Sequence, residues 1–200
     1  MRTLLVTDLH INSTVRKLTR AQIDCILNIF QKESPDEVII MGDIFMYRKP
    51  SPSDLLAFKE IVDTITLECP LYVLRGNHDS ETKADDGVTA LSIFDKATII
   101  KHVWTDYSRK RVFIPHYEDQ QKIIDALEVV PEDYTVFGHF GFRGCLNSLG
   151  DLDFDIPLNY FRSRTFLGHI HNYSQGQGGL PESPKVVTTL GTQYTTNFGE

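Results

Sequence analysis

The chain lacks the features of a membrane protein or a disulfide-stabilised fold. No run of about 18 apolar residues occurs, so no membrane-spanning helix is expected. The sequence reaches an acidic residue at Asp8, too early for the apolar region of a signal peptide. The three cysteines, Cys25, Cys69 and Cys145, are odd in number and far apart, which argues against disulfides or a CxxC zinc site. These absences predict a soluble, cytoplasmic protein with no membrane partner.

Positive charge is also scarce, since the formal net charge is -7 at pH 7. This ordinarily counts against a nucleic-acid partner, because affinity for phosphates comes largely from Lys and Arg. Carboxylates that hold divalent cations would, however, leave the folded site less negative than the residue count suggests. The charge therefore does not exclude nucleic acid.

What is present is enough for one α/β domain. With 200 residues, 41% of them hydrophobic, and no internal repeat, a single domain over residues 1–200 is expected. Alternating apolar and amphipathic runs in the first half predict βαβ units and a largely parallel inner sheet. The expected strands are 3–7, 37–41, 71–75, 97–100, 110–114, 134–137, 165–167 and 185–189. The expected helices are 14–32, 53–66, 118–129 and a short one near 86–94, with loops at 141–155 and 174–183.

Polar residues cluster directly after these strands. Asp8 and His10 follow the first strand, Asp43 the second, Asn77, His78 and Asp79 the third, His139 the strand 134–137, and His169 and His171 the strand 165–167. The carboxyl ends of strands in an α/β sheet converge on one crevice, where ligands bind. Because residues i and i+2 of an extended backbone point the same way, Asp8 with His10, and His169 with His171, are each expected to aim two ligands together.

The side-chain types indicate a transition-metal site. Imidazole, carboxylate and carboxamide donors suit Mn, Fe, Zn or Ni better than Ca, and the thiolates of structural zinc sites are missing. The donors are Asp8, His10, Asp43, Asn77, His139, His169 and His171. They are too many for one ion with an open position, whereas two ions sharing a carboxylate would use them all.

Taken singly, each of these residues has an ordinary structural explanation. A histidine after a strand is more often structural, Asp8 could cap a helix, and Gly76-Asn77 could be a turn. His116 also ends a strand, but the Gly138-His139 context favours His139, so His102 and His116 are taken as ordinary residues. The complete ordered set favours a metal site.

These blocks, in this order, resemble the calcineurin-like metallophosphoesterases. The resemblance implies a four-layer α/β/β/α sandwich with a dinuclear metal site at the carboxyl ends of its strands. It implies that Asp8, His10 and His171 hold the first ion and Asn77, His139 and His169 the second. Asp43 would bridge the ions, and His78 would protonate the leaving oxygen or stabilise its charge. Two such ions generate hydroxide from water and stabilise charge in an in-line displacement.

Secondary motifs are similar to the SbcD and Mre-eleven type of DNA repair nuclease. They include Gly42-Asp43-Ile44-Phe45 running to Lys49-Pro50-Ser51, Ala84-Asp85 and Ala90-Leu91 after the third block, and Gly191-Thr192-x-Tyr194, where Gln193 replaces the usual proline. Protein phosphatases of the superfamily carry GDxVDRG instead, and His78 excludes the small GNCD phosphodiesterases. The resemblance implies a nuclease acting on DNA ends or single strands. Its metal would be Mn, with Fe, Zn, Ni or Mg as alternatives.

Partners and competing functions follow from the same resemblance. Members of this branch continue into a capping domain and a helix that docks on an SbcC-type ATPase, whereas this sequence stops at Glu200. It is either a trimmed catalytic domain or a compact relative. The segments 53–66 and 86–94 occupy the region through which the branch dimerises, so a homodimer is an expectation. The alternatives to a nuclease are a phosphodiesterase or phosphatase for a nucleotide or other small phosphoester, and an inactive metal-binding scaffold, against which the retained His78 and seven ligands argue.

Overall fold

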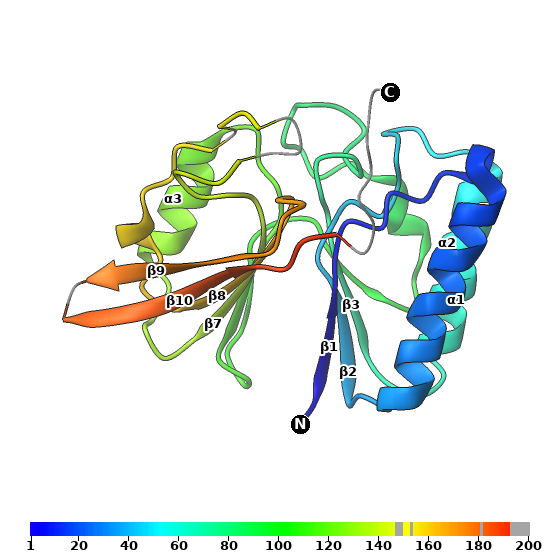
Figure 1. The fold of residues 1–200 in the computed structure, drawn as a ribbon, viewed down its shortest axis with the longest axis horizontal. Coiled ribbons are helices and arrows are strands. Elements are labelled where there is room, and N and C mark those ends of the chain that lie inside the picture. The colour runs from blue at the N-terminus through cyan, green and yellow to red at the C-terminus, as the bar shows by residue number, and fades with distance from the viewer. Residues whose placement is uncertain (147–149, 153, 181, 193–200) are drawn as a thin grey trace.

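Two β-sheets packed face to face, with helices on both outer faces, make up the protein (Figure 1). The computed structural model describes residues 1–146, 150–152, 154–180 and 182–192. The first sheet has the order β1 (Thr3–Val6), β2 (Glu37–Ile40), β3 (Leu71–Leu74) and β4 (Thr98–Ile100), all parallel. Helices α1 (Arg16–Glu33) and α2 (Pro52–Ile65) pack on it.

The second sheet is mixed. Its order is β5 (Trp104–Asp106), β6 (Arg111–Ile114), β7 (Thr135–His139), β8 (Arg164–Gly168), β10 (Ser183–Thr189) and β9 (Ser174–Leu180). Strands β6, β7, β8 and β10 are parallel, and the edge strands β5 and β9 are antiparallel to their neighbours. Helix α3 (Gln120–Glu128) packs on its outer face, and three 3-10 helices, η1 (Ser13–Val15), η2 (Ala90–Ile93) and η3 (Leu158–Tyr160), lie in connections. The predicted four-layer α/β/β/α sandwich is confirmed.

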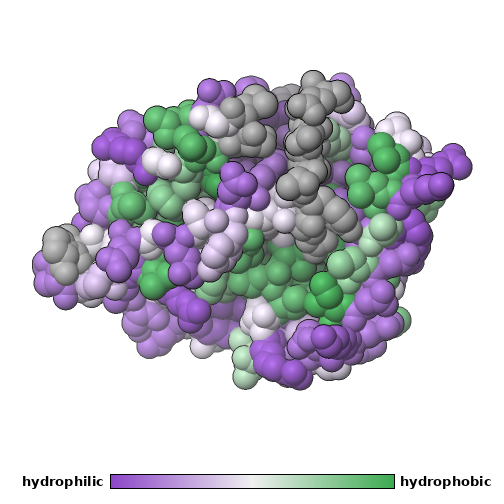
Figure 2. All heavy atoms as spheres, viewed as in Figure 1, coloured by the Kyte–Doolittle hydropathy of each residue, from purple (hydrophilic) through white to green (hydrophobic). Residues whose placement is uncertain are grey.

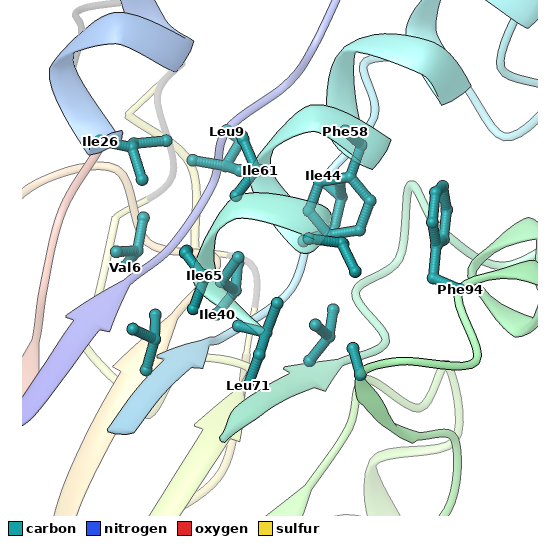
Figure 3. Packing of buried hydrophobic residues seen from close by; sticks show 14 of the residues in the cluster. Val6, Leu9, Ile26, Ile40, Ile44, Phe58, Ile61, Ile65, Leu71 and Phe94 are labelled. Atoms are coloured by element: carbon teal, nitrogen blue, oxygen red, sulfur yellow. The ribbon is translucent and has the colours of Figure 1, made fainter. Parts of the chain in front are cut away.

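Strand β2 explains why the layers stack in this order. Its side chains alternate, so that Val38 and Ile40 pack in the cluster under α1 and α2 while Ile39 and Met41 pack against the second sheet. All four side chains are fully buried, as expected for a central parallel strand covered on both faces. Figure 3 shows the helix side of this packing, where Phe58, Ile61 and Ile65 of α2 lie over the strands.

Helix α2 begins at a capping box. The Ser51 hydroxyl accepts a hydrogen bond from the Asp54 N–H at 3.2 Å, the Asp54 carboxylate accepts one from the Ser51 N–H at 2.8 Å, and Pro52 opens the helix. The Lys49-Pro50-Ser51 run, which supported the nuclease resemblance, therefore has a structural use as the start of a helix.

Most predicted elements lie within two residues of their observed bounds. Three expectations were wrong. Strand β5 was not predicted, only 90–93 of the expected helix near 86–94 is helical, and 174–183 is no loop but contributes the hairpin of β9 and β10. Glycine explains the last error, because a Cβ at Gly178 would lie 2.7 Å from Phe161 Cβ. Here glycine permits close packing of a strand and not a flexible loop.

Hydrophobic side chains are partly visible where the two sheets meet. In Figure 2 they gather between the region of β8 and that of β1, while hydrophilic residues cover α1 at the lower right. Leu5, Phe166 and Leu190 belong to this inter-sheet layer and are only partly buried. Within the described part of the chain, no helix has the length and apolar character needed to cross a membrane.

Candidate metal centre

The predicted site residues meet at the carboxyl edge of both sheets, and the local backbone brings them there. Four of them adopt left-handed backbone conformations: Asp8 (φ 53°), His10 (φ 47°), Asp43 (φ 50°) and His169 (φ 76°). Asp and His tolerate this region better than most residues, but it is still strained and typical of functional sites. The expectation that an extended i, i+2 spacing aims the ligands was therefore wrong. Sharp turns at the strand ends aim them.

Asp8, His10 and His171 form one group of potential ligands. His10 Nε2 and His171 Nε2 lie 3.8 and 3.7 Å from Asp8 Oδ1 and 3.3 Å from each other. The other carboxylate oxygen, Oδ2, accepts hydrogen bonds from the Thr7 hydroxyl and, at 3.0 Å, from the His169 N–H. Oδ1 is buried and accepts no hydrogen bond from any described residue, which leaves it to a cation.

Asp43, Asn77, His139 and His169 form a second group. His139 Nε2 lies 3.3 Å from Asp43 Oδ1, and His139 Nδ1 donates to the Met41 carbonyl at 2.5 Å, so the tautomer that faces the site offers a lone pair. Although His169 and His171 are two residues apart, they belong to different groups. The spacing that suggested a shared target instead spans the whole site.

Asn77 provides the test of whether these groups fit a metal. Its inward amide atom lies 3.0 Å from His169 Nδ1 and 3.2 Å from His139 Nε2 and from both oxygens of Asp43. With its oxygen turned inward, only a cation between these atoms offsets their mutual repulsion; without one, the NH2 group can turn in instead. The donor set thus fits two ions of the Mn, Fe, Zn type.

Asp43 lies between the two groups. Its Oδ2 is 3.9 Å from His10 Nε2 on one side, and its Oδ1 is 3.3 Å from His139 Nε2 on the other. His78 adjoins the same carboxylate: its backbone N–H donates to Asp43 Oδ1 at 2.9 Å, and its Nδ1 lies 2.6 Å from the Met46 carbonyl oxygen. His10, Asp43 and His78 also lie within ligand distance of one another.

Asp79 holds this arrangement together, a role that the sequence reading did not give it. Its buried carboxylate accepts backbone N–H groups from Ile44 (2.9 Å), Phe45 (3.2 Å) and Gly76 (2.8 Å). These bonds join the loop that carries Asp43 to the loop that carries Asn77. Burial, together with the nearby Asp43 charge, raises the pKa of Asp79 to about 6.

Two glycines permit the close approach of the ligand loops. A Cβ at Gly76 would lie 2.2 Å from Asp43 Oδ1, and one at Gly168 would lie 2.1 Å from the Thr7 hydroxyl that supports Asp8. The glycines of the GNHD and GHxH blocks are therefore required by contact with the ligands and their supports.

His116 is buried beside the second group, contrary to its treatment as an ordinary residue. Its ring stacks on His169, with centroids 5.6 Å apart, and burial lowers its pKa to about 3, so the ring is neutral. A signal existed, because His116 follows strand β6 as the ligands follow theirs. His102, the other histidine set aside, is exposed.

A four-layer sandwich with Asp, Asn and His donors converging at its strand ends defines the metal-dependent phosphoesterases. The chain belongs to the calcineurin-like phosphoesterase family, whose model matches residues 1–187. It is thus a member of a family of divalent-metal phosphoester hydrolases, as the sequence motifs predicted.

Several known proteins are similar to this chain. The SbcD subunit of the nuclease SbcCD of Staphylococcus saprophyticus is 21% identical over 230 residues, which cover 88% of this chain and 61% of that protein. The chain thus spans less than two thirds of this relative. The nuclease MPE of Pseudomonas putida (TM-score 0.53, 16% identity, 100% of this chain, 77% of that one) and a dimetal phosphatase of Danio rerio (0.54, 14%, 96% and 87%) share the fold.

Metal binding is expected to release a proton from His139. Burial disfavours its charged form, but the Asp43 carboxylate outweighs burial and raises the pKa of His139 to about 9 in the metal-free protein. At pH 7 the ring is therefore protonated, and a cation that takes its lone pair displaces about one proton. Burial lowers the pKa of His10 to about 4, so His10 releases none. The apparent affinity should weaken about tenfold per unit of pH below 9 for each such proton.

Titration calorimetry with Mn²⁺ in buffers of different ionisation enthalpy measures this release. The binding heat at pH 7 should vary with the buffer in wild type, and the variation should be lost in His139→Asn. A wild-type binding heat that is the same in every buffer contradicts the expectation.

Proposed function

We propose that this chain is a two-metal phosphodiester hydrolase that cleaves DNA, with Mn²⁺ as its metal. In this assignment Asp8, His10 and His171 hold one ion, Asn77, His139 and His169 hold the other, and Asp43 bridges them. Two ions so placed supply hydroxide at neutral pH and stabilise the charge of the reacting phosphate. The two ligand groups joined through Asp43, with 3.3 and 3.9 Å to their nearest histidines, carry the hydrolase part of the proposal.

His78 is assigned the leaving group. The contact of its Nδ1 with the Met46 carbonyl fixes Nδ1 as the hydrogen-bond donor and leaves Nε2 to hold the proton that the leaving oxygen needs. Its ring lies edge-on to that of His10, with centroids 5.1 Å apart, so it borders the first ligand group. His78 therefore adjoins the reacting phosphate while its backbone N–H supports Asp43.

Replacement of His78 with Asn should lower kcat in proportion to the difficulty of the leaving group. Loss of a general acid costs typically 10²- to 10⁴-fold, roughly, for an alkoxide such as a sugar oxygen. The loss should be much smaller for p-nitrophenolate, which leaves without a proton. The measurement compares kcat for a dinucleotide and bis-p-nitrophenyl phosphate, with the bound Mn²⁺ counted in both proteins. A variant that has lost an ion would instead make His78 a ligand.

Exposed aromatic and basic side chains beside the site support DNA as the substrate. Tyr47 (56% exposed) directly follows Met46, whose carbonyl positions His78, and Tyr173 (66% exposed) follows His171 by two residues. Lys49 is exposed on the same loop as Tyr47. Aromatic rings bind single-stranded nucleic acid by stacking on its bases, which does not require a basic protein. The printed names of two similar proteins, the nuclease SbcCD and the nuclease MPE, add support.

One substrate panel tests the proposal. Purified protein with Mn²⁺ is offered labelled single-stranded and double-stranded DNA beside bis-p-nitrophenyl phosphate, with Asp43→Asn as the inactive control. We expect wild type to cleave the ester and DNA, single strands and ends foremost. Cleavage of the small ester but never of DNA refutes the nuclease assignment and supports the alternative, a phosphodiesterase or phosphatase for nucleotides or other small phosphoesters.

The alternative rests on charge. Arg48, next to Tyr47, does not offer its guanidinium to a substrate, because it bonds the Thr82 carbonyl at 3.0 Å and Glu118 at 3.1 Å. With a net charge of -7 the protein also has weak long-range attraction for a polyanion. The fold similarity to the Danio rerio dimetal phosphatase is compatible with this second function.

Removal of the two rings should weaken DNA binding selectively. Stacking on one base contributes about 1–3 kcal/mol, so Tyr47→Ala and Tyr173→Ala should each raise KM for single-stranded DNA about 5- to 100-fold. The effect should vanish on an oligonucleotide with abasic residues flanking the cleaved bond. Tyr107→Ala is the matched control, since this exposed tyrosine lies between β5 and β6 at the opposite edge of the sheets. Equal effects on normal and abasic DNA would contradict stacking.

A homodimer through α2 and η2 is proposed as the assembly. Leu56 (67% exposed) and Ile93 (61%) line one cavity between these elements, together with the apolar Leu55 and Phe94. The same region pairs in the nuclease branch that the sequence resembles. An SbcC-type ATPase partner is proposed for the longer relatives only.

Leu56→Glu should convert the dimer to a monomer in light scattering, because it buries a charge in the interface. Tyr107→Glu, on a distant exposed site, should leave the dimer intact. A wild type that stays monomeric even at about millimolar concentration, where weak interfaces still form, would refute the dimer.

A further inference from the structure

His116 lies at the same sheet edge as the ligands but has no assigned task. Strands β6, β7 and β8 are adjacent and parallel. Their carboxyl ends carry His116, His139 and His169 in turn. Three neighbouring strand ends thus each place a histidine on the second ligand group, and only two of these belong to the donor set.

The surroundings of His116 fix its ring. It lies nearly parallel to the His169 ring (28°), and the edges of His139 and Phe154 approach it with centroids 6.3 and 6.0 Å away. Arg75 holds its backbone on both sides: the His116 N–H donates to the Arg75 carbonyl at 3.1 Å, and the Arg75 guanidinium donates to the His116 carbonyl at 2.5 Å. The ring therefore keeps one orientation beside the second group.

The polar atoms of this ring lack partners. His116 is 7% exposed, and neither ring nitrogen forms a hydrogen bond with any described residue. A buried donor or acceptor without a partner is unfavourable, and phenylalanine would fill the same space without that cost. An imidazole in this place is explained by a partner that arrives with the ligand.

That partner is not the metal ion itself. Among the described residues, the groups whose ligand atoms all lie within 4.8 Å of one another include His139 and His169 but not His116. Imidazole binds a metal in the plane of its ring, and a ring stacked on His169 directs its nitrogens beside the His169 lone pair and not along it. His116 thus faces a group seated next to the second ion.

We propose that His116 donates its ring N–H to a phosphoryl oxygen of the substrate bound beside Asn77, His139 and His169. The inference rests on the proposed phosphoester hydrolase site but not on DNA as the substrate. It makes His116 a phosphate-binding residue that completes the site on the side away from His78.

Calorimetric titration of the Mn²⁺-loaded protein with inorganic phosphate tests this directly. His116→Phe keeps the stacked ring and removes the N–H. We expect it to bind two Mn²⁺ with wild-type affinity and phosphate about 10- to 100-fold more weakly, as for loss of a hydrogen bond to a charged group. His116→Asn and His116→Gln place an amide N–H near one or the other ring nitrogen, so at least one should recover phosphate binding. His102→Phe, on an exposed histidine, is the matched control.

Each outcome decides the matter. Unchanged phosphate affinity in His116→Phe overturns the proposal, and so does loss of an ion, which would make His116 a ligand. If His116→Phe does not fold, His116→Leu is judged by the same criteria. Wild-type protein that loads two Mn²⁺ but binds no phosphate would instead refute the phosphoester site itself. Failure to cleave DNA refutes only the nuclease assignment.

Discussion

The protein is organised around electron-pair donors that converge at one sheet edge although they repel one another. The fold holds them by tying the other end of each group to the backbone. Asp8 Oδ2 accepts the His169 N–H while Oδ1 faces the site, and His139 Nδ1 donates to Met41 while Nε2 faces the site. Asp79 joins the two loops through three N–H groups. The repulsion is relieved only by a cation or a proton, so metal binding, protonation and folding are coupled.

This arrangement explains why an acidic chain can act on phosphoesters. The carboxylates that make the sequence negative are concentrated where cations neutralise them, and the local field at the site is then set by the ions. Around the site, the exposed groups are aromatic more than basic, and Arg48 is used to hold a loop. Binding by stacking, with His116 and the ions on the phosphate, fits such a surface better than a basic groove.

The similar structures separate what the fold determines from what it does not. A nuclease and a phosphatase share this sandwich with the chain at 16% and 14% identity. The ligand set and the sheets are the common part, and they determine metal-assisted attack on phosphorus. Substrate choice lies in the rim that loops build around the ions, which fold similarity does not transmit.

Sequence reading identified the fold class, most elements and the eight residues that meet at the sheet edge, because strand ends, glycines and ligand types are local signals. It erred where packing decides. The glycines of 174–183 indicated a loop, but Gly178 serves contact with Phe161 in a strand. The Gly191-Thr192-x-Tyr194 motif ends at Tyr194, outside the described residues.

The sequence by itself determined which side chains are available to bind metal and at which strand ends they lie. Only the tertiary structure decided how they divide. His169 and His171 separate into different ligand groups because left-handed turns, and not extended strands, carry them. It also distinguished His102 from His116, which a sequence presents alike, since burial beside His169 depends on β6 lying next to β7 and β8. Local chemistry is written in the chain, whereas the directions of side chains depend on contacts between residues far apart in it.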